Sequence, residues 1–557
     1  MTTLNGVPVS PGRAAGVVVT MPAAVPEPPL ARLPVGSDLD AAVASIDAAA
    51  QVVTADLFDR AGRATGTAAD VLAVTAAMAA DPTLAADAAR RVRVDGETPA
   101  RAVWDAAQTV IEQLEGLGGH MAERARDVRD VRDRIVAELT GQRPPGVPEP
   151  GHAFVLVAHD LAPADTATLD PETTLALVTE SGGPTSHTAI LARALGIPAV
   201  VAVAGAGELA DGETVLVDGG RGTVERDPAP EAVAAAAERR HAHRSFEGEG
   251  HTADGVHVEL LANVADTGSA AAAAAAGAEG IGLFRTEFLF LGRPEEPSVA
   301  EQTAAYRGVL DAFAGRKVVV RTLDAGADKP LPFLPADGER NPALGVRGLR
   351  TAVAHPDVLE RQLEAISAAA RGADAQVWVM APMVSTPDEA TRFAERCAAH
   401  GLTQPGVMVE VPAAALEARW LLERAMFASL GTNDLTQYAM AADRELGALA
   451  ELSTAWQPAV LRLVAATCEG ARAAGERPVG VCGEAAGDPA LAPVLVGLGV
   501  TSLSMAPAAL GDVAAVLAAT SSARCRELAA LALGARDAWA ARKAVRAALP
   551  ELEELGL

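Results

Sequence analysis

The spacing of apolar residues changes several times along the chain, and each change indicates a different kind of structure. Short apolar runs at Gly6–Val9 and Gly16–Val19, with a Pro-Gly turn between them, are typical of strands. From Asp38 onward, apolar residues recur at three- and four-residue spacings or their multiples, as on one face of a helix. Proline-rich stretches at 22–34 and 144–151 bound this helical pattern. The pattern therefore predicts a small helical bundle inserted after the first strands.

Strand-like runs return behind the predicted bundle, with helical pieces between them. These runs are Phe154–Ala158, Thr174–Val178, Ala199–Val203 and Thr214–Val217. They predict a compact α/β domain that the bundle interrupts. An alanine- and charge-rich segment from Pro230 to about Ser245 follows, and its composition predicts a helical linker.

Beyond Gly255, apolar runs alternate regularly with helical segments. The eight runs are Val256–Leu261, Gly280–Phe284, Val318–Val320, Val377–Met380, Val407–Val409, Phe427–Leu430, Val479–Val481 and Ser502–Met505. Eight such units over about 250–300 residues predict a (β/α)8 barrel of the TIM type. The run Ala270–Ala276 is predicted to be one of the barrel helices, because alanine is the best helix former and Gly277 can end it.

The predicted fold class is therefore multidomain α/β, with four parts. The α/β domain takes residues 1–21 and 146–228, and the inserted helical bundle takes 22–145. A linker helix spans 229–251, and the C-terminal barrel spans 252–557. Aromatic residues are only 3% of the chain, so alanine and small aliphatic side chains must fill the cores. This composition favours closely packed helices over an all-β sandwich.

Charge and cysteine content narrow the possible partners and compartments. The formal net charge of −26 opposes binding to nucleic acid or anionic lipid, and it favours a basic protein partner. Solubility alone would explain the acidity equally well. The four cysteines lack CxxC spacing, so neither a zinc site nor a disulfide framework is predicted. With no signal-peptide pattern and no uninterrupted apolar run of about 20 residues, we expect a cytoplasmic protein without membrane insertion.

Charged residues follow the predicted barrel strands, where the active site of such a barrel lies. Arginines suit an anion rich in oxygens, because guanidinium pairs bidentately with phosphate and carboxylate. Two carboxylates suit Mg²⁺, which is usually held by one or two carboxylates together with substrate phosphate. The residues are Arg285, Arg321, Glu410, Asp434 and Cys482 after strands, with Arg347 and Arg444 in nearby loops. The set predicts a small ligand that carries phosphate and carboxylate and is bridged to Mg²⁺.

Each of these residues also has an ordinary explanation when taken alone. Any single arginine is more often a loop residue or a salt-bridge partner. A cysteine such as Cys482 is commonly buried and inert, although on the rim of the site it could give a proton to a carbanion. Only the position of the whole set at strand ends favours a binding site.

A second candidate site lies in the predicted α/β domain, at His187. Gly182 and Gly183 allow a tight turn, and Thr185 and Ser186 are common N-cap types before a predicted helix. Backbone N–H groups and the helix dipole at such a place favour an attached phosphate. A neutral imidazole is also a competent nucleophile near pH 7. Alternatively, His187 is a capping or packing histidine.

Three segments resemble signatures of the phosphoenolpyruvate-utilising enzymes. They are Gly-Gly-Pro-Thr-Ser-His-Thr-Ala-Ile-Leu-Ala-Arg at 182–193, Val-Met-Val-Glu-Val-Pro-Ala-Ala at 407–414 and Leu-Gly-Thr-Asn-Asp-Leu-Thr-Gln-Tyr at 430–438. The resemblance extends over nearly the whole chain, including the predicted bundle, and is closest to enzyme I of the bacterial phosphotransferase system. One departure is Pro184, where many members have Arg.

The resemblance implies a role for each candidate residue. His187 matches the nucleophile that is phosphorylated on Nε2, and Cys482 matches the general acid that converts enolpyruvate to pyruvate. The implied substrate-binding residues are Arg285, Arg321, Arg347, Asn433, Asp434 and Arg444, and the implied Mg²⁺ ligands are Glu410 and Asp434. The implied reaction is phosphoryl transfer from phosphoenolpyruvate to the carrier protein HPr, the first step of sugar uptake.

The resemblance also implies an arrangement of parts. The bundle would bind HPr, the His187 domain would swivel, and the barrel would form a homodimer.

Two other hypotheses about function stay open. Dikinase and synthase relatives need an added nucleotide-binding domain of a few hundred residues. Here only about 150 residues precede the His187 domain, they are mostly helical, and they contain no Walker-type loop. A non-catalytic regulatory protein would be expected to have lost His187, the carboxylates or Cys482, all of which are present.

Overall fold

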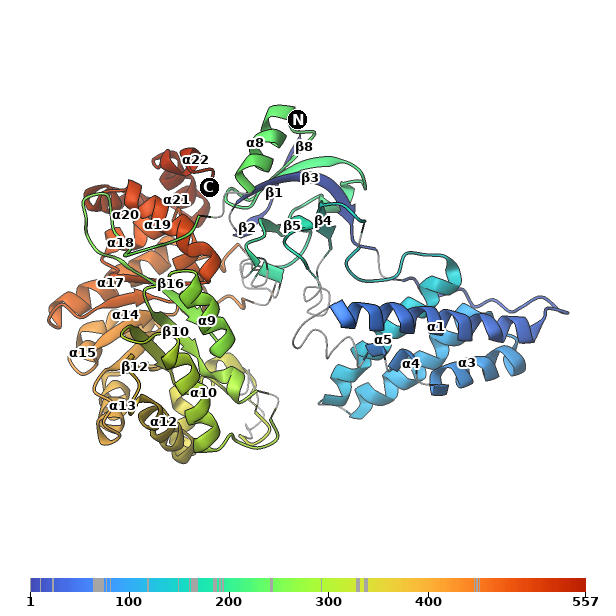
Figure 1. Ribbon diagram of the computed structural model, residues 1–557, viewed down its shortest axis with the longest axis horizontal. Helices are drawn as coiled ribbons and strands as arrows, with labels where there is room; N and C mark the ends of the chain where they lie inside the picture. The colour runs from blue at the N-terminus through green and yellow to red at the C-terminus, as the bar shows by residue number, and fades with distance from the viewer. Residues whose placement is uncertain are drawn as a thin grey trace. The chain divides into compact units, whose positions relative to one another are not determined.

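The structure is a computed structural model (Figure 1). It describes residues 2–10, 12–22, 25–63, 75–76, 78–80, 82–117, 120–148, 150–159, 161, 169–183, 188–189, 192, 195–240, 244–291, 293–326, 331–334, 339–444, 446, 449 and 451–557.

An eight-stranded sheet is formed by strands from before and after the helical bundle. Its order is β1-β8-β7-β3-β4-β5-β6-β2. The strands are β1 (Thr3–Asn5), β2 (Val7–Ser10), β3 (Arg13–Thr20), β4 (Phe154–Ala158), β5 (Thr174–Thr179), β6 (Ala199–Val201), β7 (Thr214–Asp218) and β8 (Thr223–Arg226). Strands β3, β4 and β5 are parallel, with Val17 opposite Phe154. Every residue of β4 and β5 is buried, as expected for parallel strands covered on both faces.

Several details of this sheet differ from the sequence prediction, and one is that strand β1 lies before the first predicted run, Gly6–Val9. Strand β6 ends at Val201, two residues early, because Ala202 takes a left-handed backbone conformation with φ of 52°. Strand β8 was not predicted, since its Thr-Val-Glu-Arg sequence has only one apolar residue, the buried Val224. The insertion of the bundle between β3 and β4 agrees with the prediction.

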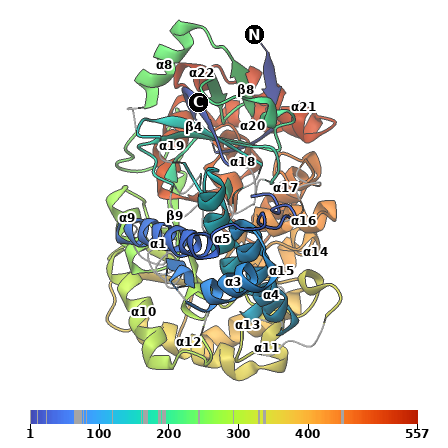
Figure 2. The same ribbon diagram turned by 90° about the vertical axis from the view of Figure 1, so that its right-hand side faces the viewer.

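The inserted segment is a bundle of helices that lie side by side in Figures 1 and 2. They are α1 (Leu39–Arg63), α3 (Pro82–Asp95), α4 (Pro99–Leu117) and α5 (His120–Thr140). Helix α1 contains a stretch, Leu39–Asp59, that is long and apolar enough to cross a membrane by length and composition alone, although Asp40, Asp47 and Asp56 interrupt it. Its Ile46 and Leu57 are buried in the bundle core, which makes α1 a core helix of this bundle.

The C-terminal part is a closed barrel of eight parallel strands, preceded by helix α8 (Pro230–Arg240). The strands are β9 (Glu259–Val264), β10 (Ile281–Arg285), β11 (Lys317–Arg321), β12 (Gln376–Ala381), β13 (Pro405–Val409), β14 (Phe427–Leu430), β15 (Val479–Val481) and β16 (Ser502–Met505). Each strand pairs with its sequence neighbour, and β16 closes onto β9. The predicted fold class, multidomain α/β with a C-terminal barrel, is confirmed.

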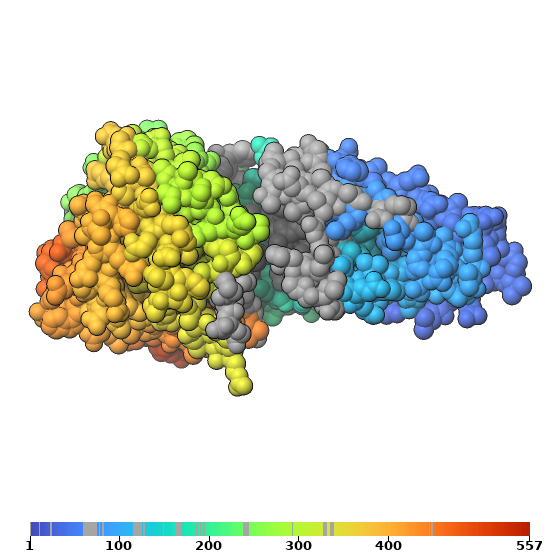
Figure 3. Space-filling model, turned by 90° about the horizontal axis from the view of Figure 1, so that it is seen from below, coloured from blue at the N-terminus to red at the C-terminus, as the bar shows by residue number. Residues whose placement is uncertain are grey.

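Helices surround the barrel strands in Figure 1, and Figure 3 shows the lime-to-orange segments as a continuous outer surface. The helices are α9 (Thr267–Ala275), α10 (Val299–Asp311), α11 (Thr351–Ala354), α12 (Pro356–Ala370), α13 (Pro387–Ala399), α14 (Pro412–Leu416), α15 (Ala418–Leu422), α16 (Thr432–Met440), α17 (Pro458–Ala473), α18 (Ala492–Leu498), α19 (Leu510–Ala519), α20 (Ser522–Gly534), α21 (Ala538–Ala547) and α22 (Glu551–Glu554). The alanine-rich run at Ala270 is indeed helical.

The first barrel strand lies later in the chain than predicted. The prediction placed it at Val256–Leu261, but β9 spans Glu259–Val264. The reason is a turn in which the Val256 backbone N–H donates to Thr252 Oγ1 and Val256 is largely exposed. An apolar residue at a turn was therefore mistaken for the start of the strand.

Candidate active site

The carboxyl ends of the barrel strands bring most of the predicted site residues to one rim. Strands β10 and β11 end at Arg285 and Arg321, which are opposite each other in the parallel pair. Glu410 directly follows β13, and Cys482 directly follows β15. Asn433 and Asp434 lie in the first turn of α16, just after β14, while Arg347 and Arg444 reach the same rim from loops. The sequence prediction of a charged rim is thus supported by the positions of these side chains.

The arginines of the rim are held by carboxylates. Arg321 bonds Glu287 through Nη2, and its Nη1 lies 3.3 Å from Asp324 Oδ2. Asp324 is fully buried and also lies 3.2 Å from Arg347 Nη2. Burial alone would lower the pKa of Arg321, but the surrounding carboxylates Glu287, Asp324 and Glu410 outweigh it and raise that pKa.

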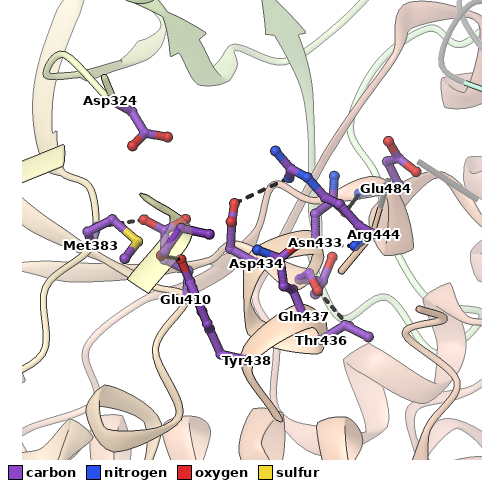
Figure 4. A network of polar contacts seen from close by, with 12 residues as sticks. Asp324, Met383, Glu410, Asn433, Asp434, Thr436, Gln437, Tyr438, Arg444 and Glu484 are labelled. Carbon is purple, nitrogen blue, oxygen red and sulfur yellow. Dashed lines mark hydrogen bonds and ion pairs between the residues drawn. The ribbon is translucent and has the colours of Figure 1, made fainter. Parts of the chain in front are cut away.

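A second ion-pair group joins the loops to α16. Asp434 accepts from Arg347 Nη1 at 3.2 Å and from Arg444 Nη1 at 3.4 Å. Figure 4 shows Arg444 reaching Asp434, with Asn433 on the same turn. The Asn433 side-chain oxygen accepts from the Glu484 backbone N–H at 3.3 Å, which ties α16 to the segment after β15.

Glu410 is a buried carboxylate that faces other acids. Only 1% of it is exposed, and its Oε1 accepts from the Met383 backbone N–H at 2.6 Å. Met383 has φ of 58°, a strained value for a residue with a side chain, and Figure 4 shows its backbone directed at Glu410. Burial, with the neighbouring charges of Asp434 and Asp324, raises the pKa of Glu410 well above its usual range.

This donor set fits a hard divalent cation. Glu410 and Asp434 offer oxygen ligands from adjacent strand ends, and their mutual repulsion would be relieved by a cation between them. Among the residues that the structure describes, no group of three or more His, Cys, Asp and Glu side chains gathers as a metal site. Two carboxylates would therefore need substrate or water oxygens to complete the coordination, which is the usual arrangement for Mg²⁺.

Several polar atoms at the rim remain available to a ligand. Within the described part of the chain, Arg321 Nε, Glu287 Oε2 and Thr432 Oγ1 are buried without a hydrogen-bond partner. Most buried polar atoms have a hydrogen-bond partner, so three unpartnered atoms gathered at one rim are consistent with a site that a ligand completes. The Arg321 Nε in particular is a buried donor beside the strand ends, as binding of an anion would require.

Cys482 lies 2% exposed at the end of β15. Its thiol donates to the Leu430 carbonyl oxygen at a sulfur–oxygen distance of 3.6 Å. Burial raises the pKa of Cys482, and this effect exceeds the opposing influence of Ser429 and Arg321. The thiol is therefore protonated at neutral pH, which suits a proton donor and not a nucleophilic thiolate.

The second predicted site is the segment around His187. His187, Pro184, Thr185 and Ser186 lie outside the described residues. Of the flanking positions, Gly182 has φ of 99°, as a tight turn requires, and the helical Thr188 is buried. The role of His187 thus remains a prediction from the sequence.

Two buried acids of the rim, Glu287 and Asp324, are not indicated by the sequence pattern alone. A usable signal was present, because each follows an arginine at a strand end by two or three positions. Residues that neutralise a binding arginine are expected at such positions, since a buried unpaired cation is costly.

Comparison with known proteins matches three segments of the chain. Residues 5–124 match the N-terminal domain, 151–222 the mobile domain and 239–522 the PEP-binding domain of PEP-utilising enzymes. The phosphoenolpyruvate-protein phosphotransferase of Streptomyces coelicolor is 52% identical over 554 residues, covering 98% of this chain and 99% of the relative. The chain belongs to the family of PEP-utilising enzymes.

Other members are similar over shorter lengths. The phosphoenolpyruvate-protein phosphotransferase of Haloferax volcanii is 44% identical and covers 77% of this chain and 78% of its own length. A multiphosphoryl transfer protein of Rhodobacter capsulatus is 43% identical over 75% of this chain and 52% of its own length. The family resemblance predicted from the three signatures is confirmed, and PEP-utilising enzymes of this family use a divalent metal.

Proposed function

We propose that this chain is a phosphoenolpyruvate–protein phosphotransferase. It takes the phosphoryl group of phosphoenolpyruvate onto His187 and passes it to the carrier protein HPr, as the first step of sugar uptake. The observation that carries the proposal is the rim that combines Arg321 and Arg347 with Glu410, Asp434 and a protonated Cys482. End-to-end similarity to a relative of that name supports it.

The arginines bind and orient the substrate in this proposal. Arg285, Arg321 and Arg347 contact the phosphate and carboxylate of phosphoenolpyruvate, with Asn433 and Arg444 completing the pocket. Arg321 and Arg347 already lie in place through Asp324, so little reorganisation is needed when the substrate enters. Glu410 and Asp434 are the ligands for Mg²⁺, which when bound neutralises charge on the phosphate.

The proposed bond changes involve His187, phosphoenolpyruvate and Cys482. His187 Nε2 attacks the phosphorus, so that a P–N bond forms as the bond between phosphorus and the enol oxygen breaks. The electron pair stays with the enolate, and the Cys482 thiol gives its proton to the terminal carbon, which produces pyruvate. The phosphoryl group then moves from His187 to a histidine-bearing carrier.

Partner binding and assembly extend the proposal to the other parts. The bundle of α1, α3, α4 and α5 binds HPr, the His187 domain swivels between barrel and carrier, and the barrel forms a homodimer in the cytoplasm. The proposed domains are the α/β domain at 1–21 with 146–228, the helical bundle at 22–145, the linker helix at 229–251 and the barrel at 252–557. Pro184 carries no charge, so any phosphate contact made by Arg in other members is absent at this position. A dikinase is disfavoured, because similarity to a phosphotransferase covers 98% of the chain.

The test is incubation with labelled phosphoenolpyruvate and Mg²⁺, followed by mapping of the labelled peptide. Acid-labile phosphate on the peptide containing His187, and its loss in His187→Ala, would support the proposal. Transfer of label to purified HPr tests the second step. Folded protein that releases no pyruvate and takes up no label would contradict the proposed activity and favour a regulatory protein.

A further inference from the structure

A chain of buried side-chain hydrogen bonds runs behind the rim, between helices α10 and α12 and the ends of β10 and β11. Its members are Gln302, Tyr306, Gln362 and Thr286, and each is at most 1% exposed. The chain begins at the Pro297 carbonyl oxygen, which accepts from Gln302 Nε2 at 2.9 Å. Such a set of fully buried polar side chains is costly unless every member is satisfied, so its position requires an explanation.

The direction of every bond is fixed by one backbone group. The Leu323 backbone N–H can only donate, and it donates to Gln362 Oε1 at 2.8 Å. Gln362 Nε2 must then donate to both Tyr306 Oη and Thr286 Oγ1, each at 3.1 Å. Tyr306 in turn donates to Gln302 Oε1 at 3.1 Å. The Gln362 amide thus uses both of its hydrogens and its oxygen.

Near the site, two members of this hydrogen-bond network contact the backbone at the end of β11. Thr286 Oγ1 donates to the Arg321 carbonyl oxygen at 2.9 Å, and the Leu323 N–H is the donor to Gln362. Between them, the Thr322 N–H donates to the Met380 carbonyl oxygen of β12 at 2.9 Å. The three successive residues from Arg321 to Leu323 are therefore held from two sides, and they separate the two partners of the Arg321–Asp324 ion pair.

We infer that Gln362 is a positioning residue for the phosphate-binding arginine of the rim. It acts through the Arg321–Leu323 backbone and touches no substrate, and the inference rests on the proposed role of Arg321. An apolar side chain in its place would leave the buried Leu323 N–H without its acceptor, and it would remove the donor to Thr286 Oγ1, which would keep only its bond to the Arg321 carbonyl oxygen. The backbone would then shift toward other partners and move the guanidinium with it.

The protein offers matched control residues at the other end of the same hydrogen-bond network. Gln302 has the same side chain and the same full burial as Gln362, but it bonds Pro297 and Tyr306 and not the strand ends. Likewise, Tyr306→Phe removes one partner of Gln362 and keeps the bond to Leu323, whereas Thr286→Val removes the donor to the Arg321 carbonyl. Gln362 and Thr286 form the near pair, and Gln302 and Tyr306 form the far pair.

The experiment measures phosphoenolpyruvate binding with Mg²⁺ by calorimetry in a His187→Ala background, where no phosphoryl transfer occurs. Thermal melting of each variant reports the structural cost separately. We expect Gln362→Leu and Thr286→Val to raise the dissociation constant about tenfold, and Gln302→Leu and Tyr306→Phe to change it less than about twofold, although all four lower the melting temperature.

Equal loss of affinity in the near and far pairs, or unchanged affinity in the near pair, would overturn the inference and leave the network a purely structural one. If Gln362→Leu does not fold, Thr286→Val and Tyr306→Phe give the same comparison with smaller changes. Arg321→Ala is measured in the same series. Unchanged affinity in Arg321→Ala, or no binding to the His187→Ala parent, would instead contradict the proposed function.

Discussion

Strand β11 begins with Lys317 and ends with Arg321, and its two cations lie in contrasting surroundings. Lys317 bonds one carboxylate, Glu259, and its Nζ lies 4.7 Å from the ring centroid of Trp378. Arg321 is surrounded by three acids, Glu287, Asp324 and Glu410. Both side chains are about equally buried, with 11% and 8% exposed. Burial alone therefore does not distinguish a structural cation from one in a binding site.

The difference lies in how completely the charges are matched. At the amino end of the barrel, one lysine meets one carboxylate and one aromatic face, and nothing further is required. At the carboxyl end, burial and then the neighbouring carboxylates raise the pKa of Glu410, and Arg321 Nε and Glu287 Oε2 lack partners among the described residues. Buried polar atoms without partners and like charges close together lower the stability of the fold, and they are available to bind a ligand.

The largest effect expected is that of Arg321→Ala. The variant removes a phosphate-binding group, so kcat/KM for phosphoenolpyruvate should fall by about 10³–10⁵, the range found for arginines that stabilise phosphoryl transfer. It also leaves Glu287 without its cation and Asp324 with Arg347 alone, and breaking such a buried pair costs about 3–5 kcal/mol of unfolding free energy. Coupled pyruvate assays and denaturant titration measure the two effects. Arg321→Lys, which keeps the charge, should recover stability more than activity; the reverse would contradict the assignment.

Glu410→Gln should separate activity from stability. Loss of a cation ligand is expected to lower the pyruvate-forming rate by about 10²–10³. Without Mg²⁺ the variant should be at least as stable as the parent, most clearly at a pH where the parent Glu410 ionises, because the buried charge that faces Asp434 and Asp324 is then absent while the amide oxygen can still accept from Met383. Melting curves in the presence of a chelator provide the check. Clear destabilisation would show that Glu410 is a structural carboxylate like Glu259.

The pH dependence of stability offers a second view of Glu410. Its folded pKa is raised above the unfolded value of about 4.3, so the folded state binds the extra proton. The contribution of this proton to stability is full below about 4.3 and is lost as pH rises through the folded pKa. In the presence of a chelator, the parent should lose stability as pH rises from about 4.3 through the folded pKa of Glu410. The Glu410→Gln variant should not show this loss. Identical pH curves for the two proteins would show that Glu410 is not in this buried acidic setting.

Cys482→Ala should produce a smaller loss confined to chemistry. Removal of the proton donor is expected to slow pyruvate formation about a hundredfold, with phosphoenolpyruvate affinity nearly unchanged. Because burial raises the thiol pKa, the donor stays protonated above the usual thiol value of about 8.5, and the parent rate should persist there. Pyruvate release and ligand binding are measured on the same samples. An equal loss of binding would count against the role of proton donor.

Much of the difference between the two ends of the barrel could be predicted from the sequence, because the ends of barrel strands are easy to recognise. Strands β14, β15 and β16 begin and end at the predicted residues, so Asp434 and Cys482 follow directly. Gln362 could not be predicted, because it lies in an amphipathic helix where a polar residue normally faces solvent. Only the packing of α12 against β10 and β11 turns it inward.

Lys317→Met should have the smallest effect and completes the comparison on β11. It removes a matched pair at the amino end of the barrel and leaves Glu259 with 31% of its side chain exposed, so water can solvate the remaining charge. The cost to unfolding free energy is therefore expected to be about 1 kcal/mol or less, with kcat and KM unchanged. Thermal melts and the coupled assay, run beside Arg321→Ala, measure both. A loss of activity here would mean that the two ends of the strand are coupled, and charge matching would then no longer separate the structural end of the barrel from the end that binds substrate.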